Sequence, residues 1–275
     1  NYKFTWNPRN VVLAGQGVAQ FIENGQLKFI PYHRLFSRAR TYSVLNYGNF
    51  EMYPNRDSLQ YREIYDLKTI PTLIRGTLRK AGYCKAWNVF VQLGATDDAY
   101  KVPNSENLTY RGFINSFLAY DPKLTVEEKL KQEIAEANDP IVFEKLKWLG
   151  IFEEKRVAIS NASPAQILQK ILEEKLLLEP NDKDMIVMQH IFDYEMGGKK
   201  LRRKSSMVII GKDTVHTAMS ITVGTPLAIA IKRVLTGELK EKGVIIPTKP
   251  SVYLPILKEL EEFGVKFIEE EETID

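Results

Sequence analysis

The sequence predicts an α+β fold (mixed α/β) in which a mixed sheet is flanked by helices. Short runs in which apolar and polar residues alternate indicate strands, and longer runs with an apolar residue every three or four positions indicate helices. The two kinds of run are mixed along the chain, and no internal repeat or low-complexity linker separates them. That mixture is typical of α+β or mixed α/β proteins.

The composition bounds the class of protein. The 275 residues allow one large domain or two small ones, and 44% apolar and 27% charged residues are typical of a soluble globular chain. A net charge of +3 gives no argument for nucleic acid or a membrane surface. No run approaches the ~20 apolar residues of a membrane span. A single cysteine, Cys84, excludes an internal disulfide framework and favours a reducing compartment, so we expect a cytoplasmic protein.

Elements in the first third follow from periodicity and from glycine and proline. The apolar spacing after Pro8 predicts a helix, since proline suits a first helical turn. Alternation predicts the strands, and Gly94 predicts a helix end. The predicted elements are a helix over 8–22, strands over 29–32, 41–44 and 73–79, and a helix over 84–93.

Capping residues place the helices of the middle third. Thr125 and Glu128 form a capping box, which starts a helix that runs to about Ala137. Asp-Pro at 139–140 starts the next helix, which runs to about 150, and Ser-Pro at 163–164 starts a third, which runs to 178.

The last third is predicted to form strands and two further helices. A glycine pair and the basic run 199–204 form a long hairpin loop between two of the strands, and the acidic run 269–272 is a solvated tail. The predicted elements are strands over 184–194, 205–210, 243–247 and 265–268, a helix that Thr225-Pro226 opens, and a helix over 250–263.

Two arginine-bearing phrases carry the strongest indication of a ligand. They are YPNRDS at 53–58 and IRGTLR at 74–79. Arg75 and Arg79 share a face whether their segment is a strand or a helix. A guanidinium offers planar, bidentate donors to carboxylates and phosphates, so two such phrases indicate a ligand with more than one anionic group. The alternative is that these arginines form surface ion pairs, which are common and weak.

Other motifs have simpler interpretations. VVLAGQG at 11–17 imitates a dinucleotide fingerprint, but Gln20 takes the third glycine position, so a helix that ends in a glycine-rich loop fits better. The three histidines have no metal-ligand spacing, so we expect no metal site. Asp213 and His216 are too little for a catalytic pair, and Cys84 fits a core position. The basic run lacks interleaved aromatic residues, so we expect no nucleic-acid binding.

Together these phrases resemble the saccharopine dehydrogenase (saccharopine reductase) family, specifically its C-terminal substrate-binding and dimerisation domain. The resemblance covers about residues 1–268. The phrases that carry it are KFTW at 3–6 followed by Arg9, YPNRDS at 53–58, RGTLR at 75–79, DMIVMQH at 184–190, TVGTP at 222–226 and GVIIP at 243–247.

The resemblance implies a fold and a role. In that family a Rossmann domain binds the nicotinamide cofactor, NAD or NADP, and an inserted domain binds saccharopine and pairs two subunits. This chain begins without methionine and lacks the fingerprint, so we expect a piece of a longer enzyme. By the resemblance, residues 1–222 form the substrate-binding and dimerisation domain of a homodimer. Residues 223–275 then lie at the boundary with the Rossmann domain.

The resemblance also assigns residues. Arg56 of the YPNRD phrase, together with Thr77, Leu78 and Arg79, corresponds to the saccharopine-binding positions of the family. Asn7 corresponds to a position near the cofactor, where family members often have serine. The acid and base of the reaction are expected largely from the Rossmann domain, so no catalytic residue is assigned here.

Two alternatives to saccharopine dehydrogenase stay open at this point. A related carboxynorspermidine-type dehydrogenase has the same fold but a ligand with fewer carboxylates, which the paired arginine phrases disfavour. A non-catalytic dimerisation module would keep the fold without the site, and the presence of Arg56 and Arg79 argues against it.

Overall fold

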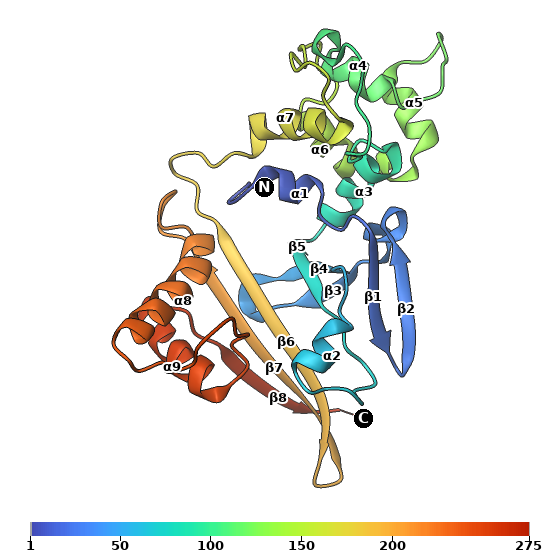
Figure 1. Cartoon of the computed structure of the whole chain (residues 1–275). Coiled ribbons are helices and arrows are strands. Elements are labelled where there is room, and N and C mark those ends of the chain that lie inside the picture. Colours follow the sequence, from blue (N-terminus) through green and yellow to red (C-terminus); the bar gives the residue numbers. More distant parts are fainter. Residues whose placement is uncertain (1, 275) are drawn as a thin grey trace. The chain divides into compact units, whose positions relative to one another are not determined.

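A computed structural model describes residues 2–274 and confirms the α+β class (Figure 1). The chain divides into two compact units, one of residues up to 42 together with 49–177, the other of residues 43–48 together with 178 onwards. This grouping rests on packing and not on ligand binding, so the functional division between residues 222 and 223 stays a prediction.

The first unit holds two small sheets. β1 pairs antiparallel with β2, and β3, β4 and β5 form a three-stranded sheet in that order. The strands are β1 (Val18–Glu23), β2 (Gln26–Pro31), β3 (Arg40–Ser43), β4 (Asn49–Pro54) and β5 (Gly76–Lys80). β1 buries Ala19 and Phe21 on one face and leaves Val18 exposed on the other, where Ile22 is nevertheless buried at the far end of the strand.

The helix expected over 8–22 is wrong in its second half. α1 (Pro8–Val12) ends before Gly15 and Gly17, whose φ angles of 84° and 94° lie in the left-handed region, and β1 follows. A Cβ at Gly15 would meet Leu35 Cδ2 at 2.5 Å, so a larger residue would displace the Leu35 side chain as well as strain this backbone. The order is therefore helix, glycine loop, strand, which is the reverse of a dinucleotide-binding turn.

Five helices build the rest of the first unit, with α2 (Gln60–Ile64) on the loop between β4 and β5. They are α3 (Tyr83–Leu93), α4 (Tyr110–Asn115), α5 (Val126–Glu133), α6 (Pro140–Trp148) and α7 (Pro164–Leu176). The capping box expected at Thr125 forms, and Ser163 caps α7 as expected and also forms a capping box with Gln166. Gly94 ends α3 in the left-handed conformation. One hydrophobic core joins strands and helices, from Phe21 of β1 to Phe90 of α3 and Leu168 of α7.

Short 3₁₀ helices connect these elements, and one of them shortens a predicted helix. The helix expected from Thr125 to about Ala137 ends at Glu133, and a 3₁₀ turn follows it. The 3₁₀ helices are Tyr32–Arg34, Phe36–Arg38, Leu45–Tyr47, Ser105–Asn107, Ala135–Asn138 and Glu261–Phe263.

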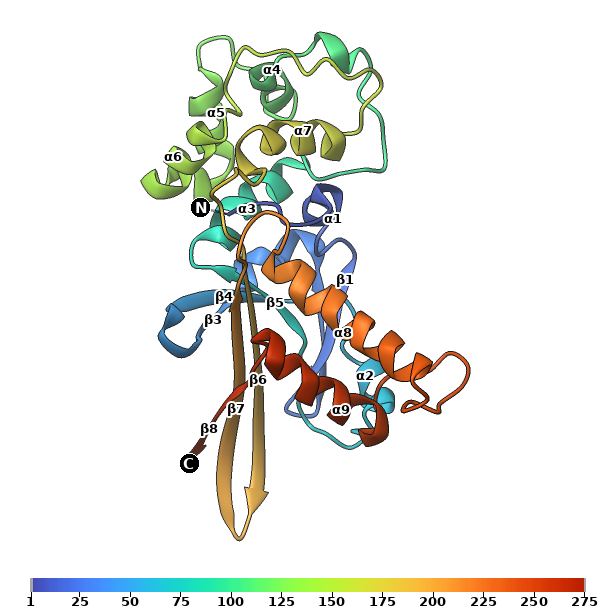
Figure 2. The same ribbon diagram turned by 90° about the vertical axis from the view of Figure 1, so that its left-hand side faces the viewer.

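The second unit is a three-stranded antiparallel sheet with two helices beside it (Figures 1 and 2). Its strands are β6 (Met185–Met196), β7 (Lys199–Ile210) and β8 (Ile268–Thr273), and its helices are α8 (Ala218–Leu235) and α9 (Pro250–Leu260). Met207 and Ile209 of β7 pack with Ile229 of α8 and Leu260 of α9 in a core separate from that of the first unit.

The basic loop and the acidic tail are both corrected. Residues 199–204 belong to β7, and only Gly197 and Gly198 form the turn. Residues 269–272 belong to β8, where Glu271 lies opposite Arg203 and the two side chains pair at 2.6 Å. Residues 199–204 also pair with β6, and opposite charges on β7 and β8 stabilise the pairing that turns the acidic run into a strand.

The start expected for α8 is also wrong. The helix begins at Ala218, seven residues before Thr225, and Pro226 lies inside it. Thr217 caps it by accepting a hydrogen bond from the Ser220 amide at 3.0 Å, and Asp184 accepts from the amides of Ala218 and Met219. These caps outweigh proline's preference for a first turn.

α8 is long and apolar enough to cross a membrane by length and composition alone. Only Ala218 and Ile229 of this helix are buried, and a regularly spaced apolar stripe that includes Val223, Leu227 and Ile231 is exposed. Length and composition do not distinguish a membrane span from a helix that packs against protein.

The last two predicted strands differ from the structure. Residues 243–247 form no strand, and Val244 is fully exposed, because none of the described strands pairs with this segment. The strand expected over 265–268 begins at Ile268 instead, while Val265 packs in the core of the second unit. α9 and the 3₁₀ turn after it match the helix expected over 250–263.

The two capping boxes allow the stability contribution of a buried cap to be compared with that of an exposed cap. Ser163 is fully buried and also donates a hydrogen bond to Asp98, whereas Thr125 is exposed. We expect Ser163→Ala to lower the free energy of unfolding by about 2 kcal/mol and Thr125→Ala by about 1 kcal/mol. Urea unfolding of both variants measures this, and equal losses would show that the buried hydrogen bond to Asp98 adds nothing.

Candidate functional site

The candidate site lies on one face of the β4–β5 pair. In the antiparallel register Tyr53 faces Thr77 and Glu51 faces Arg79. Residues directly opposite each other in such a pair point to the same side, and alternate residues share it, so these four side chains lie on one face.

Arg79 sits among aromatic rings. Its guanidinium carbon is 5.4 Å from the ring centroid of Tyr2 and 5.4 Å from that of Tyr83. Its Nε is buried without a hydrogen-bond partner, and its Nη1 makes one long contact of 3.4 Å with the Leu78 carbonyl. Within residues 2–274 no carboxylate pairs with it. A largely desolvated cation without a counter-charge is costly, and an anionic ligand would relieve that cost.

The tyrosines around Arg79 are neutral hydrogen-bonding groups. Burial raises the pKa of Tyr2, Tyr53 and Tyr83, so their hydroxyls keep their protons at neutral pH. Burial alone would lower the pKa of the Arg79 guanidinium, but Tyr83, Tyr53 and Tyr2 together raise it above its usual range. Arg79 therefore stays fully charged.

Glu51 lies opposite Arg79 in the β4–β5 register, but its carboxylate caps the N-terminus of α3. One oxygen accepts a hydrogen bond from the Gly82 amide at 2.7 Å and the other from the Cys84 amide at 2.8 Å. These are orphan donors at the N-terminus of α3, where the helix dipole favours a negative charge. Glu51 is thereby drawn to α3 and does not pair with Arg79.

The YPNRDS phrase forms a loop whose polar groups support its own structure. The Asn55 amide donates to the Arg75 carbonyl at 2.9 Å, and the Arg75 amide donates to the buried Ser58 hydroxyl at 3.0 Å. Asp57 accepts from the Leu59 amide at 2.7 Å. These bonds join the loop after β4 to the residue that precedes β5.

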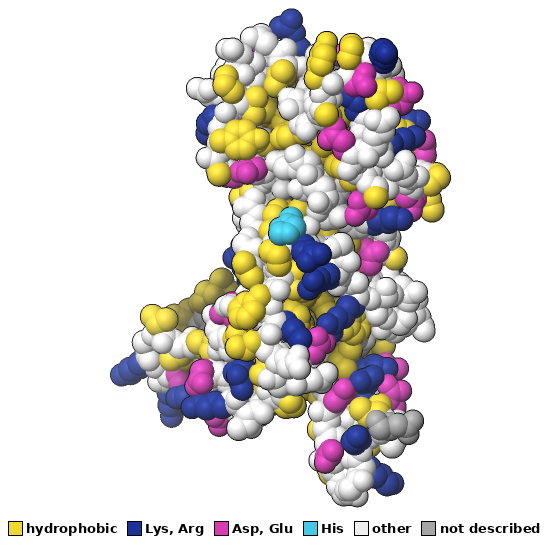
Figure 3. Space-filling model, turned by 90° about the vertical axis from the view of Figure 1, so that its right-hand side faces the viewer, with side chains coloured by type: hydrophobic (Ala, Val, Ile, Leu, Met, Phe, Trp, Pro, Cys, Tyr) yellow, Lys and Arg dark blue, Asp and Glu magenta, His cyan; other side chains and the backbone are white. Residues whose placement is uncertain are grey.

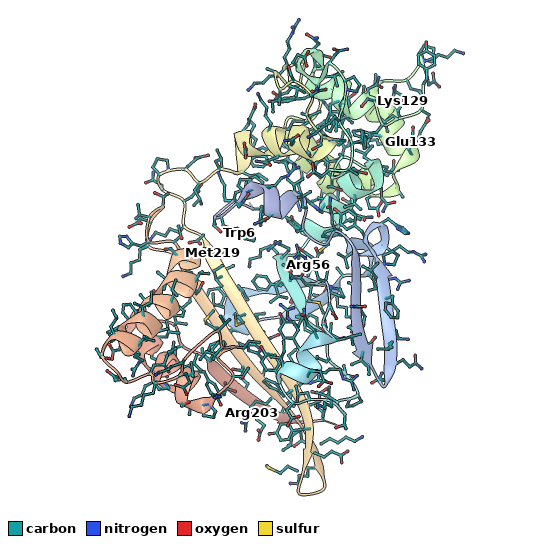
Figure 4. All side chains as sticks on the ribbon, in the orientation of Figure 1. Trp6, Arg56, Lys129, Glu133, Arg203 and Met219 are labelled. Atoms are coloured by element: carbon teal, nitrogen blue, oxygen red, sulfur yellow. The ribbon has the colours of Figure 1, made fainter. Side chains whose placement is uncertain are left out.

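Arg56 is the exception in this loop (Figure 4). Its carbonyl accepts a hydrogen bond from the Gln20 amide at 2.9 Å, which holds the backbone at φ 51°, in the left-handed region. That conformation costs a non-glycine residue about 1–2 kcal/mol. The side chain is exposed and forms no ion pair with the described residues, so its charge is available to a ligand.

Arg75 and Arg79 have different surroundings. The Arg75 guanidinium lies 4.0 Å from the ring centroid of Tyr61 on α2, in a cation–π contact. Arg75 thus ties α2 to the start of β5, while Arg79 occupies the tyrosine group. The sequence analysis singled out both arginines but not Tyr2 or Tyr83. The one feature of the sequence that could have indicated these tyrosines is their position beside the phrases KFTW and IRGTLR.

The other predicted site residues are placed but their roles stay predictions. Thr77 shares the face of Arg79, whereas Leu78 lies on the opposite face, opposite Met52 of β4. The Asn7 side chain caps α1, where its oxygen accepts from the Arg9 amide at 2.9 Å.

The remaining motifs have structural roles. Cys84 is buried and free, as expected, and burial raises its thiol pKa. His190 lies in β6 against the rings of Phe192 and Phe267. The described residues contain no cluster of three or more potential metal ligands. Dark blue and magenta side chains are interspersed over the face drawn in Figure 3, without a continuous basic surface.

Asp213 organises the turn before α8. It accepts from the amides of Val215 and His216, at 2.8 and 2.6 Å, and from the His216 ring at 3.1 Å. The His216 amide and ring, and then the Val215 amide, lower the pKa of Asp213 to about 2. The pair therefore forms the turn that precedes α8.

This turn predicts a pH dependence. Because the folded pKa of Asp213 lies below its ordinary value of 3.8, its contribution to stability is present above about pH 4 and is lost as the pH falls toward 2. A carboxyl-carbon NMR titration should give a midpoint near pH 2. Asp213→Asn should reduce the dependence of stability on pH in that window by the contribution of this carboxyl, and a midpoint near 4 would contradict the assignment.

Comparisons with known proteins match this chain to one family over nearly its whole length. Residues 1–265 match the saccharopine dehydrogenase C-terminal domain family. The saccharopine dehydrogenase (NADP(+), L-glutamate-forming) of Schizosaccharomyces pombe is 31% identical over 286 residues, covering 100% of this chain and 62% of that protein. Mouse mitochondrial alpha-aminoadipic semialdehyde synthase is 34% identical, over 97% of this chain and 29% of its own length.

A solved structure resembles the fold as well. It is the apo histidine-tagged saccharopine dehydrogenase (L-Glu forming) from Saccharomyces cerevisiae, with a TM-score of 0.84 and 31% identity. The match covers 100% of this chain and 62% of that one. The chain thus spans less than two thirds of the length of these relatives.

Proposed function

Because the chain belongs to the saccharopine dehydrogenase family, we propose that it is the substrate-binding part of an enzyme that oxidises saccharopine with NADP. The observation that carries this proposal is the pair of cationic groups, Arg79 and Arg56, for which the described residues supply no counter-ion. The names of the S. pombe and S. cerevisiae relatives specify NADP and formation of L-glutamate.

The chemistry of saccharopine fits such a site. Saccharopine joins lysine and glutamate skeletons through a secondary amine and carries three carboxylates. Arginine forks on two of them would fix the carbon that loses its hydride. The cofactor accepts that hydride, the resulting imine takes up water, and the carbon–nitrogen bond then breaks to give glutamate and α-aminoadipate semialdehyde. A carboxynorspermidine-type substrate has fewer carboxylates and would leave one arginine without a partner.

We assign the binding of most of the nicotinamide cofactor to a further part of the enzyme, because the N-termini of α3 and α8 are already occupied. Helix N-termini bind cofactor phosphates in many dehydrogenases. Here the N-termini of α3 and α8, which follow β5 and β7, are occupied by the carboxylates of Glu51 and Asp184. The glycine loop follows a helix instead of a strand. Asn7 remains the proposed contact, through its amide nitrogen, because its oxygen caps α1.

Calorimetric titration of saccharopine into the 275-residue chain tests the substrate assignment, with glutamate and lysine as comparisons. We expect saccharopine to bind more tightly than either, since only it offers three carboxylates. Equal affinities for saccharopine, glutamate and lysine would contradict the proposal.

Arg56→Ala should weaken saccharopine binding. A hydrogen bond to a charged group contributes about 1.5–3 kcal/mol, which corresponds to roughly tenfold to hundredfold in Kd. Arg38→Ala is the matched control, because Arg38 is also exposed but ends a 3₁₀ helix outside the site. An unchanged Kd for Arg56→Ala would exclude Arg56 as a ligand-binding residue.

A further inference from the structure

Arg79 is held by neutral groups where an acidic partner was available. Glu51 lies directly opposite Arg79 in the β4–β5 register, the position from which cross-strand ion pairs form. Both Glu51 oxygens are instead bonded to amides at the start of α3. The α3 N-terminus thus takes up the carboxylate that would otherwise neutralise Arg79.

Tyrosines take the place of that carboxylate. The rings of Tyr2 and Tyr83 lie at equal distances of 5.4 Å from the guanidinium carbon. Tyr53 shares the face of Arg79 and is 1% exposed. A tyrosine hydroxyl accepts a hydrogen bond from a guanidinium without cancelling its charge, and the ring faces attract the cation weakly.

The tyrosines are themselves fixed by the core. The Tyr83 ring stacks on Trp87 of α3, with centroids 5.4 Å apart and planes 9° apart, and it contacts Tyr2 at 5.2 Å. Tyr53 packs against Phe36 at 4.7 Å. A guanidinium bound to such immobile groups loses little further freedom when a ligand arrives, which favours affinity.

We propose that Tyr53 and Tyr83 are positioning residues that hold the Arg79 guanidinium oriented for a carboxylate of the ligand, while Glu51 is bonded to the start of α3. The identity of that ligand as saccharopine rests on the proposed function. The unpaired Nε–H of Arg79 is the donor left for the carboxylate. The tyrosines act through Arg79 and need not touch the reacting atoms.

The test follows the Arg79 Nε–H signal by NMR in the 275-residue chain, assigned by its loss in Arg79→Lys. Saccharopine and glutarate, a simple dicarboxylate, are the two titrants. The variant is Tyr83→Phe, which keeps the ring and removes one hydroxyl. The matched control is Tyr61→Phe, which removes a hydroxyl from the ring that contacts Arg75.

We expect both titrants to shift the Arg79 signal. Tyr83→Phe should weaken their binding about tenfold, equivalent to about 1.4 kcal/mol, and should speed exchange of the Nε proton with water. Tyr61→Phe should change neither. If Tyr83→Phe fails to fold, Tyr53→Phe makes the same test. A purely structural tyrosine would lower stability without changing the Arg79 signal or the affinity.

The outcomes separate this proposal from the function. If glutarate but not saccharopine shifts the signal, and Tyr83→Phe weakens that effect, the substrate assignment fails and the positioning role stands. If saccharopine binds but Tyr83→Phe behaves like Tyr61→Phe, the positioning role is overturned and the substrate assignment stands. If neither titrant shifts the signal, Arg79 is not a carboxylate receptor and the positioning role is overturned.

Discussion

The hydrogen bonds from the start of α3 to Glu51 are the interaction on which the candidate site depends. They join a strand of the β3–β4–β5 sheet to the helix that carries Tyr83 and Trp87 into the core. The same bonds satisfy two orphan amides of the helix and engage both oxygens of a carboxylate next to the site. With Glu51 engaged, Arg79 has no ion pair across the strands, and the cationic character of this face follows from how a helix is capped.

Many other charges near structural junctions are matched inside the chain. Asp184 caps α8, Asp139 caps α6, and the basic residues of β7 face the acidic residues of β8. Against that background, a guanidinium without a counter-ion is informative. Arg56 and Arg79 lack one for different reasons, the first because its loop projects it outward and the second because tyrosines enclose it. Saccharopine, the substrate proposed above, would supply the missing carboxylates.

Elements whose signals are local were predictable. The capping box at Thr125, the Ser-Pro start of α7, the Asp-Pro start of α6 and the glycine end of α3 each depend on residues within one helical turn. The strand that carries Thr77 and Arg79 followed from alternation, and the arginine phrases indicated an anionic ligand. The basic run failed as a loop prediction because it pairs with β6 on one side and with β8 on the other, and the acidic run failed as a tail because it pairs with β7, some 70 residues away in the sequence.

The sequence by itself determined the α+β class, the helix caps of the first unit and the family, because these depend on neighbouring residues or on phrases spread along the whole chain. Only the tertiary structure decided the state of each arginine. Arg75 and Arg79 are four residues apart and chemically identical, yet one lies on Tyr61 and the other among Tyr2, Tyr53 and Tyr83. Whether a charge is paired depends on what lies within a few ångströms, and that is set by strand register and helix capping between distant residues.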